Sequence, residues 1–432
     1  MSEPIRRGAI LTIMHSACAV LVFAAMLASP AGAQSVASPD DALRREVSAL
    51  AERLGRLESE NAALKQANES LTGRVAELEA QVAGEDSAGD SGRATATVPV
   101  AVGSAPAAAP TPQAWYERIK VSGLVFGDAY AVVENHDPTI DDQTGFWIRR
   151  GYLTFDAQLA SEWSARLRFE VNSPGDFSTN SKLEPFVKDA YLAWKREGHE
   201  LYLGLSPSPT FDFVESYWGQ RPLEKTPLDL YRFGSSRDMG VAYKGSASNG
   251  KVFYHAMFGN GSGDGSETND GKKLMGSIGL RPTDALVLQL YADYEDRPGA
   301  TDRSTWQALA GWDGVRGRYG LQYASQQREV QNAPDEDVAV ASVFGVWHLT
   351  GPDTLTVRYD RSFDGYADAD RIPYLRIATA TPFDLAILAW QHDLHPNISL
   401  IPSLEYLHYR GADEISNPDD DLYGRLTLYF TF

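Results

Sequence analysis

Nine basic side chains in the chain after residue 114 are spaced so that they could face one common interior. Arg166 and Arg168 illustrate the spacing, because they lie two residues apart in a segment where polar and apolar residues alternate. Guanidinium and ammonium groups are charged at neutral pH and donate hydrogen bonds to carboxylates and phosphates, so an interior lined by them would attract small anions. The alternative for each residue is an ion pair within the protein wall, such as Arg168 with Asp156 or Glu170. The nine candidates are Arg150, Arg166, Arg168, Arg316, Arg318, Arg358, Arg425, Lys225 and Arg221.

The sequence offers few residues for other chemistry. His392 and His395 flank a short turn, His136 and His255 stand apart, and no G-x-S-x-G motif occurs. The one cysteine, Cys18, lies in a segment expected to be removed, so neither a disulfide nor a cysteine metal site is expected. We therefore expect no catalytic residues, no metal and no cofactor, and a barrel enzyme is the weakest of the alternatives.

The overall charge is strongly acidic. The 432 residues hold 39 Lys and Arg against 58 Asp and Glu, a net charge of -19, which argues against nucleic acid as a partner because a polyanion would be repelled. Residues 1–114 contain 9 basic and 13 acidic side chains. The remaining residues therefore contain 30 basic and 45 acidic side chains, a net charge of -15. Much of this acidic excess falls in segments expected to be external loops, where it would be solvated or bind divalent cations. The clusters are Asp141-Asp142, Asp335-Glu336-Asp337, Asp368 with Asp370, Asp413-Glu414 and Asp419-Asp420-Asp421.

The elements that must position the basic residues are strands. From Trp115 onward, stretches of about ten residues alternate apolar and polar side chains, as membrane-spanning strands do, and Trp163 to Asn172 is the clearest example. If Asp364 to Pro382 is one loop, the count is sixteen strands. The fold class predicted for residues 115–432 is therefore all-β, a 16-stranded antiparallel transmembrane β-barrel. Short turns are expected near Ser161, Gly198, Ser248, Pro282, Gly314, Pro352 and Pro396, with longer loops between them.

Tryptophan positions separate this barrel from a soluble sandwich of alternating strands. Trp163, Trp194, Trp312, Trp347 and Trp390 all fall beside the expected short turns. Aromatic side chains gather where a membrane-spanning barrel crosses the lipid–water interface. The five residues therefore predict an aromatic girdle at one rim of the barrel.

The third long loop, Pro207 to Ser236, is too long and too aromatic for a simple connection. It combines the cations Arg221, Lys225 and Arg232 with six Phe, Tyr and Trp residues. We expect one of two arrangements. The loop either folds inward and narrows the interior, or forms a cap packed on its own aromatic side chains.

The first 114 residues predict three further segments. Residues 1–33 contain an apolar stretch that ends in an Ala31-Gly32-Ala33 cleavage site, which indicates a secretory signal peptide. Residues 40–83 carry an unbroken heptad series of Leu, Val and Asn, which predicts a coiled-coil stalk. Residues 84–114 are an Ala/Pro/Gly-rich linker without periodicity.

Four segments give the region from Trp115 to Phe432 a family resemblance. They are Ile148-Arg149-Arg150, Val187-Lys188-Asp189-Ala190-Tyr191-Leu192, Leu201-Tyr202-Leu203-Gly204-Leu205 and Ser235-Ser236-Arg237-Asp238-Met239-Gly240-Val241. In these segments the sequence resembles the phosphate-selective porin (porin O/P) family of outer-membrane channels. The resemblance implies a trimeric sixteen-stranded channel with an arginine-lined pore and an inward loop that bears a lysine. Arg150 would match the lumen arginine of that family, and Lys225 the loop lysine.

The residues and the resemblance together predict an outer-membrane porin for passive diffusion of small polar solutes, leaning towards small anions such as phosphate. Two alternatives stay open: a structural link between outer membrane and cell wall with a closed lumen, and a non-selective or organic-solute channel for dicarboxylates or sugars. The expected partners are outer-membrane lipid and lipopolysaccharide, two further copies in a homotrimer, and the cell wall through the coiled coil. The expected location is the bacterial outer membrane, with the stalk in the periplasm. The heptads leave open whether the stalk is dimeric or trimeric.

Overall fold

The structure is a computed structural model and describes residues 115–299, 301–411 and 417–432. These residues belong to one compact unit, Ala108–Phe432. The signal peptide, the stalk and the linker predicted before Trp115 lie outside the described residues.

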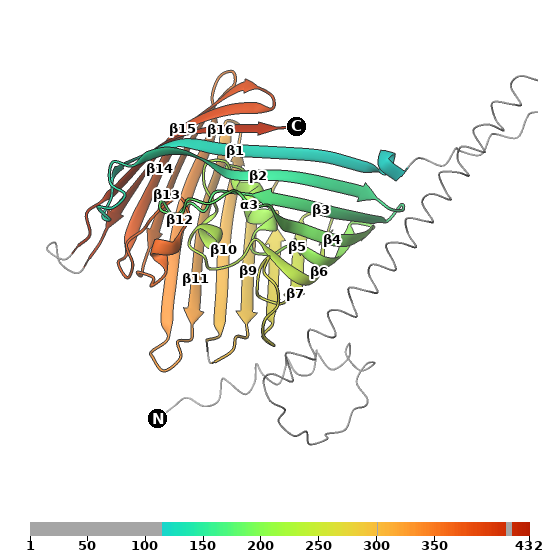
Figure 1. The fold of residues 1–432 in the computed structure, drawn as a ribbon. Coiled ribbons are helices and arrows are strands. Elements are labelled where there is room, and N and C mark those ends of the chain that lie inside the picture. The colour runs from blue at the N-terminus through green and yellow to red at the C-terminus, as the bar shows by residue number, and fades with distance from the viewer. Residues whose placement is uncertain (1–114, 300, 412–416) are drawn as a thin grey trace, which may run out of the picture. The chain divides into compact units, whose positions relative to one another are not determined.

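The strands of the described residues form one closed antiparallel barrel, in which each strand pairs with its neighbours in sequence and β1 pairs with β16 (Figure 1). The predicted fold class, a 16-stranded barrel, is confirmed. A short 3-10 helix, η1 (Trp115–Arg118), precedes the first strand. The strands are β1 (Ile119–Glu134), β2 (Thr144–Gln158), β3 (Trp163–Val171), β4 (Phe186–Arg196), β5 (His199–Pro207), β6 (Arg237–Ala247), β7 (Val252–Gly259), β8 (Lys273–Leu280), β9 (Leu286–Glu295), β10 (Arg303–Gly314), β11 (Gly317–Arg328), β12 (Glu336–His348), β13 (Asp353–Ser362), β14 (Phe383–His395), β15 (Ile398–Tyr409) and β16 (Asp421–Thr431).

The connections differ between the two rims of the barrel. Short turns join β2 to β3, β4 to β5 and so on to β14 and β15, and they fall where the sequence placed them. We call this end the tight-turn rim and the other end the long-loop rim. The segment from Asp364 to Pro382 lies in one loop at the long-loop rim and contains only a 3-10 turn, η2 (Ala369–Arg371), which confirms the strand count.

Side chains alternate between the two faces of the wall. On β9, Leu288 and Leu290 point outward and are exposed, whereas Gln289 and Tyr291 point inward and are buried. A row of exposed leucines is unfavourable in water and favourable in lipid, so the outer face has the character of a membrane-spanning barrel.

The five tryptophans predicted to form a girdle lie at the tight-turn rim. Trp163 and Trp194 are paired neighbours on β3 and β4. Trp312, Trp347 and Trp390 occupy the outward positions near the same ends of β10, β12 and β14. Their placement is that of an interfacial aromatic belt.

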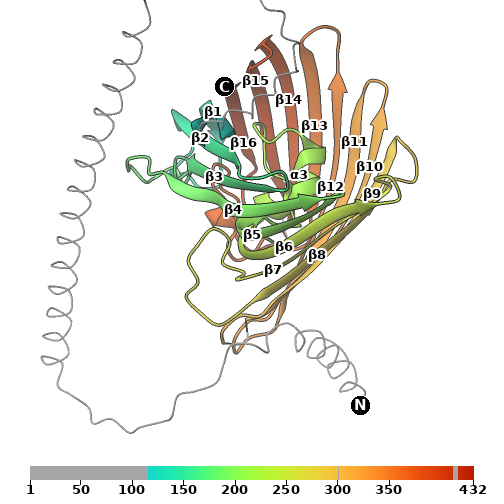
Figure 2. The same cartoon turned by 90° about the vertical axis from the view of Figure 1, so that its right-hand side faces the viewer.

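Two long loops fold into the interior. L3 (residues 208–236) joins β5 to β6 and contains α3 (Asp212–Trp218) and α4 (Pro227–Leu230), and Figure 2 shows α3 enclosed by the strands. L7 (residues 363–382) joins β13 to β14 and reaches the loop after β3, where the Tyr374 amide donates a hydrogen bond to the Gly175 carbonyl (2.7 Å). No helix among the described residues is both long and apolar enough to cross a membrane.

An apolar core, called here the inner core, lies between these loops and the wall. The inner faces of β12 and β14 are largely apolar and buried, which is unusual for a wall that faces water. L3 and L7 cover them with their own apolar side chains, so this side of the lumen is filled by protein. Members of the inner core include Val338, Val340, Phe344, Val346, Leu385, Ile387 and Ile401 from the wall, Trp218, Leu223, Leu228, Leu230 and Phe233 from L3, and Tyr366, Leu375 and Ile377 from L7.

Candidate functional site

A β-bulge on β2 turns two adjacent arginines into the lumen. Phe126 of β1 pairs with Arg150, but the next residue, Gly127, pairs with Ile148, so Arg149 is the extra residue. A bulge interrupts the alternation of the strand, and here both Arg149 and Arg150 point inward. The Arg150 Nε atom lies 2.8 Å from an oxygen of Glu170 on β3.

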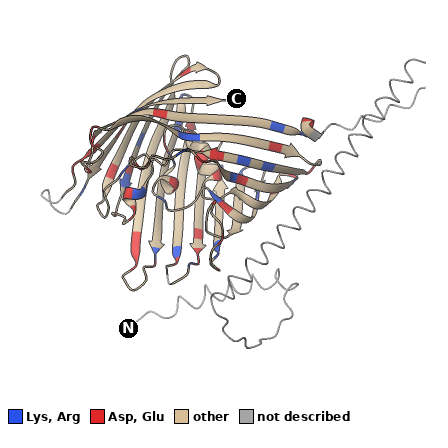
Figure 3. Cartoon of the chain, in the orientation of Figure 1, with Lys and Arg blue, Asp and Glu red and all other residues tan. Residues whose placement is uncertain are grey.

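A second bulge on β4 has the same effect on Lys188. Arg168 of β3 pairs with Asp189, and the next residue, Phe169, pairs with Val187. The bulge turns both Lys188 and Asp189 inward. Lys188 then lies 3.3 Å from Glu170, so the two bulges place Arg150 and Lys188 on either side of one carboxylate. Figure 3 shows the basic segments of β2, β3 and β4 in blue.

These side chains line a cavity of about 560 Å³ on the long-loop side of L3, which we call the upper vestibule. Ten basic and five acidic side chains line it. Three of the basic ones, Arg149, Arg237 and Lys273, also pair with the carboxylates of Glu224, Asp189 and Asp293 behind the lining, so the basic excess is smaller than the lining alone gives. The basic residues are Arg149, Arg150, Lys188, Lys225, Arg232, Arg237, Lys273, Arg297, Arg303 and Arg371, and the acidic ones are Glu170, Asp229, Asp238, Asp264 and Glu295.

Three arginines of the upper vestibule have no carboxylate partner in the part of the chain that the structure describes. Arg303 and Arg371 make no ion pair there, and Arg232 donates only to the Arg371 carbonyl (3.3 Å). Unpaired guanidinium groups keep their full attraction for a passing anion, because no internal carboxylate neutralises them.

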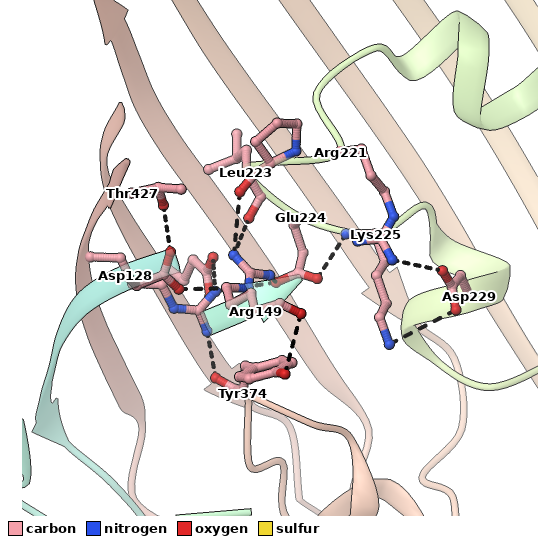
Figure 4. A network of polar contacts seen from close by, with 12 residues as sticks. Asp128, Arg149, Arg221, Leu223, Glu224, Lys225, Asp229, Tyr374 and Thr427 are labelled. Carbon is pink, nitrogen blue, oxygen red and sulfur yellow. Dashed lines mark hydrogen bonds and ion pairs between the residues drawn. The ribbon is translucent and has the colours of Figure 1, made fainter. Parts of the chain in front are cut away.

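L3 is anchored to the wall by a buried carboxylate, Glu224 (Figure 4). One oxygen of Glu224 lies 2.8 Å from Arg149 of β2 and 3.2 Å from Arg425 of β16. Arg149 also donates to the Leu223 carbonyl (2.8 Å). Burial alone would raise the pKa of Glu224, but the two guanidinium groups outweigh it and hold the pKa well below its usual range. Glu224 is therefore ionised and ties L3 to β2 and β16, the two strands that flank β1.

The other side of L3 is held by β11 and β13. Tyr231 donates its hydroxyl to Asp360 (2.7 Å), and Gln326 donates to the Phe233 carbonyl (2.6 Å). Arg358 pairs with Asp360 and donates to the Lys225 carbonyl. These contacts, with those of Glu224, fix L3 across the lumen, and the structure therefore favours the inward constriction over the external cap.

The sequence candidates fall into different settings. Arg150 and Lys225 line the upper vestibule, and Lys225 lies 3.9 Å from Asp229 within L3. Arg166 lines a side cavity of about 500 Å³ at the tight-turn rim and lies 2.7 Å from Asp156. Arg168 lies 3.2 Å from Asp189 of β4. Wall ion pairing is thus observed for Arg168, with Asp189 in place of the expected Asp156 or Glu170.

The remaining candidates lie beneath L3 or at the rim. Arg221 is in L3 and pairs with Glu215 (3.2 Å), while Arg318 donates to the Trp218 carbonyl (3.3 Å). Arg358 and Arg425 face inward, but both are buried and act as anchors of L3. The alternation predicted Arg316 on the inner wall, and this prediction is wrong. β10 ends at Gly314 and β11 begins at Gly317, so Arg316 lies exposed in the turn between them.

Sequence reasoning missed several lining residues. Arg149 and Lys188 were hidden because a bulge breaks the alternation that was used to choose the inner face. The visible signal was the pair of adjacent arginines in a strand otherwise of alternating polarity. Lys273 and Arg303 are the first residues of β8 and β10, at the long-loop rim. The loops before them do not alternate, so the sequence did not indicate whether these side chains point inward.

The acidic clusters predicted in external loops are only partly exposed. Asp335 and Asp337 are exposed, as expected. Asp421 is instead the first residue of β16, is fully buried, and lies 3.0 Å from His136. The Asp413-Glu414 cluster lies outside the described residues.

No family model matches this sequence, and no curated protein matches it. Solved structures match in fold. The anion-selective porin from Comamonas acidovorans has a TM-score of 0.56 at 13% identity, covering 73% of this chain and 99% of that chain. OmpF of Salmonella typhi, in a complex with daunomycin, has a TM-score of 0.54 at 12% identity, covering 73% and 97%. The trimer form of in-vitro folded OmpT, an outer membrane protein of Vibrio cholerae, has a TM-score of 0.50 at 10% identity, covering 73% and 99%. The chain thus has the fold of outer-membrane porins, whereas the narrower resemblance to the porin O/P family has no matching family model.

Proposed function

We propose that this chain is an outer-membrane porin through which small polar solutes diffuse passively, with a preference for small anions such as phosphate. The observation that carries the proposal is the upper vestibule, where ten basic side chains face five acidic ones and three arginines have no carboxylate partner among the described residues. The porin fold and the apolar outer face support the location in the outer membrane.

The net charge of the chain does not oppose an anion preference, because distance decides which charges a solute meets. Exposed loop carboxylates such as Asp335 and Asp337 face salt water and are screened within about 10 Å at 0.1 M ionic strength. The vestibule cations lie inside a narrow lumen with walls of low polarisability, where fields are focused and weakly screened. The local positive charge therefore sets the preference.

L3 gives the channel its constriction. It is tied to the wall at Glu224 on one side and at Tyr231 on the other, so it stays in the lumen as solutes pass. Lys225 lies between these anchors and lines the upper vestibule, and it is the residue that the porin O/P resemblance matches to the lysine of an inward loop.

The proposal extends to partners. Lipid and lipopolysaccharide would cover the outer face, and the exposed carboxylates of the long-loop rim suit divalent cations between lipopolysaccharide headgroups. We propose a homotrimer because the V. cholerae OmpT structure of the same fold is described as a trimer form. The stalk predicted from the heptads at residues 40–83 would then extend into the periplasm.

Reconstitution in planar bilayers tests the proposal directly. We expect stepwise ion conductance, and a reversal potential in a KCl gradient whose sign shows that chloride passes more readily than potassium. Absence of conductance would favour a structural link with a closed lumen. A cation preference would leave the diffusion channel standing and remove the anion preference.

A further inference from the structure

A hollow in the outer face of the barrel runs along β10, and its volume is about 400 Å³. Ala308 and Ala310 occupy two successive outward positions of this strand, since Leu309 between them points inward and is buried. The next outward residues are large, Trp306 at one end and Trp312 at the other. Two small side chains between large ones therefore form the floor of the hollow.

Large apolar side chains form the two walls of the hollow. The strand register puts Leu288 and Leu290 of β9 beside the alanines on one side, and Leu321 and Tyr323 of β11 beside them on the other. Leu290 and Leu321 are each 59% exposed, so their outer surfaces are accessible. A strand rises by about 3.4 Å per residue, so the two tryptophans are about 20 Å apart along β10. The hollow is therefore a narrow trough, called here the β10 trough, with room for one extended hydrocarbon chain.

The occupant of the β10 trough must be apolar. The side chains that point outward into it are all Leu, Ile or Ala, except for Tyr323. Within a membrane, apolar surfaces have no hydrophobic reason to associate, so a chain is held in one place by close van der Waals packing. The trough offers a chain contacts on three sides, whereas a flat wall offers them on one. An acyl chain should therefore bind in the trough more strongly than on the neighbouring wall.

An arginine without a carboxylate partner lies beyond one end of the trough. Arg316 is exposed in the turn between β10 and β11, the strands that carry Ala310 and Leu321. Within the described residues, its side chain makes no ion pair and no hydrogen bond. Asp313, the acidic residue nearest to it along the chain, occupies an inward position of β10. A guanidinium group pairs well with phosphate, so Arg316 suits the phosphate of a lipid headgroup.

The position of the turn specifies the kind of lipid. Val315, next to Arg316, is fully exposed, and an exposed apolar side chain at the end of a barrel wall suits the membrane interface. β1 begins and β16 ends at this same tight-turn rim, so the proposed periplasmic stalk places the rim on the periplasmic side. The periplasmic leaflet of an outer membrane consists of phospholipid, and lipopolysaccharide lies in the opposite leaflet. The lipid beside Arg316 is therefore a phospholipid.

We propose that the β10 trough and Arg316 form a binding site for one phospholipid of the periplasmic leaflet. One acyl chain lies along Ala308 and Ala310, the phosphate accepts hydrogen bonds from Arg316, and Val315 lies among the headgroups. This proposal rests on the place of the barrel in the outer membrane and does not depend on its conductance. A lipid held here keeps β9, β10 and β11 facing the bilayer, which leaves other strands for contacts between copies of the chain.

Native mass spectrometry of the full chain in detergent, titrated with phosphatidylglycerol, tests the site. We expect saturable binding of a first lipid in wild type. Arg316→Gln should weaken that binding about fivefold, the effect of one arginine charge near a lipid surface. Ala310→Leu fills the trough and should weaken it by a similar factor. Diacylglycerol with the same acyl chains lacks the phosphate, so its binding should fall in Ala310→Leu and stay unchanged in Arg316→Gln.

Two control variants carry the same changes outside the site. Ala386 occupies an outward position of β14 between Tyr359 and Tyr406, and it does not line the trough. Arg196 is the last residue of β4, is exposed at the tight-turn rim, and lies 3.8 Å from Glu162. Ala386→Leu and Arg196→Gln should both bind phosphatidylglycerol as wild type does.

The outcomes are distinct. The site is overturned by absence of saturable binding in wild type, by unchanged binding in Ala310→Leu and Arg316→Gln, or by an equal fall in the control variants, which would mean that lipid covers the whole wall alike. The same spectra report the oligomeric state. Its change in Ala310→Leu would assign the trough to a second copy and also overturn the site, as would stronger binding of lipid A than of phosphatidylglycerol. If Ala310→Leu does not fold, Ala308→Leu replaces it with the same expectation.

Discussion

The inner wall of the barrel has two contrasting sides. The side formed by β2, β3 and β4 is charged and partly open, and carries Arg150, Arg168 and Lys188 with their carboxylate partners. The side formed by β12 and β14 is apolar and buried under L3 and L7. The apolar side serves as a docking surface for L3 and L7, which fill the lumen next to it. The open part of the lumen, and any solute in it, therefore lies beside the charged side. The polarity of the inner wall therefore decides where the path runs.

The Glu224 anchor, which holds L3 against β2 and β16, should be the point most sensitive to substitution. Glu224→Gln removes the carboxylate shared by Arg149 and Arg425 and leaves Arg149 with Asp128 (3.6 Å) and Arg425 with Glu405 (2.8 Å) as their remaining acidic partners. Breaking a buried ion pair in this way costs about 3 to 5 kcal/mol. We expect a loss of that size in the free energy of unfolding, measured by urea titration in lipid vesicles, and noisier single-channel currents as L3 loosens.

Glu215→Gln is the matched control for the anchor. Glu215 also lies in L3 and pairs with Arg221, but it is about one-third exposed. A partly exposed pair contributes roughly 0 to 1 kcal/mol, so its loss should be hard to detect. Equal effects of the two substitutions would show that the buried network does not hold L3.

Substitutions in the apolar docking surface for L3 and L7 should have the next largest effect on the free energy of unfolding. Leu385 is fully buried on the inner face of β14, and Leu385→Ala should lower the free energy of unfolding by about 2 to 5 kcal/mol through lost packing and a cavity. Leu388 lies on the outer face of the same strand and is 49% exposed. Leu388→Ala should cost less, because it contacts lipid and no loop. The same cost for both residues would mean that the inner core does not support the loops.

Much of the fold could be predicted because its signals are local. Alternation identifies strands, and Gly and Pro mark short turns, so sixteen strands and all seven turns followed from neighbouring residues. The N-terminal segments stay predictions. The bulges at Arg149 and Lys188 could not be predicted with the same rule, since one extra residue simply looks like lost alternation.

The contacts of L3 were beyond sequence reasoning for another reason. Glu224 meets Arg149, 75 residues earlier, and Arg425, 201 residues later, and nothing near Glu224 in the sequence specifies either partner. One feature of the sequence did indicate that protein fills part of the lumen. The stretch from Val338 to Val346 is apolar on both faces, which indicates that protein covers its inner face. A strand of that kind in a barrel predicts an occupied lumen beside it.

The reversal potential of a matched pair of triple variants tests the central claim most directly. Arg232→Gln with Arg303→Gln and Arg371→Gln removes three vestibule charges without breaking an ion pair among the described residues. Asp142→Asn with Asp335→Asn and Asp337→Asn removes three exposed loop charges. In a KCl gradient across planar bilayers, the arginine variant should shift the reversal potential towards cation preference, and the aspartate variant should shift it little, with an effect that fades as salt rises. An unchanged reversal potential in the arginine variant, or a larger shift in the aspartate variant, would contradict the claim that the vestibule sets the anion preference.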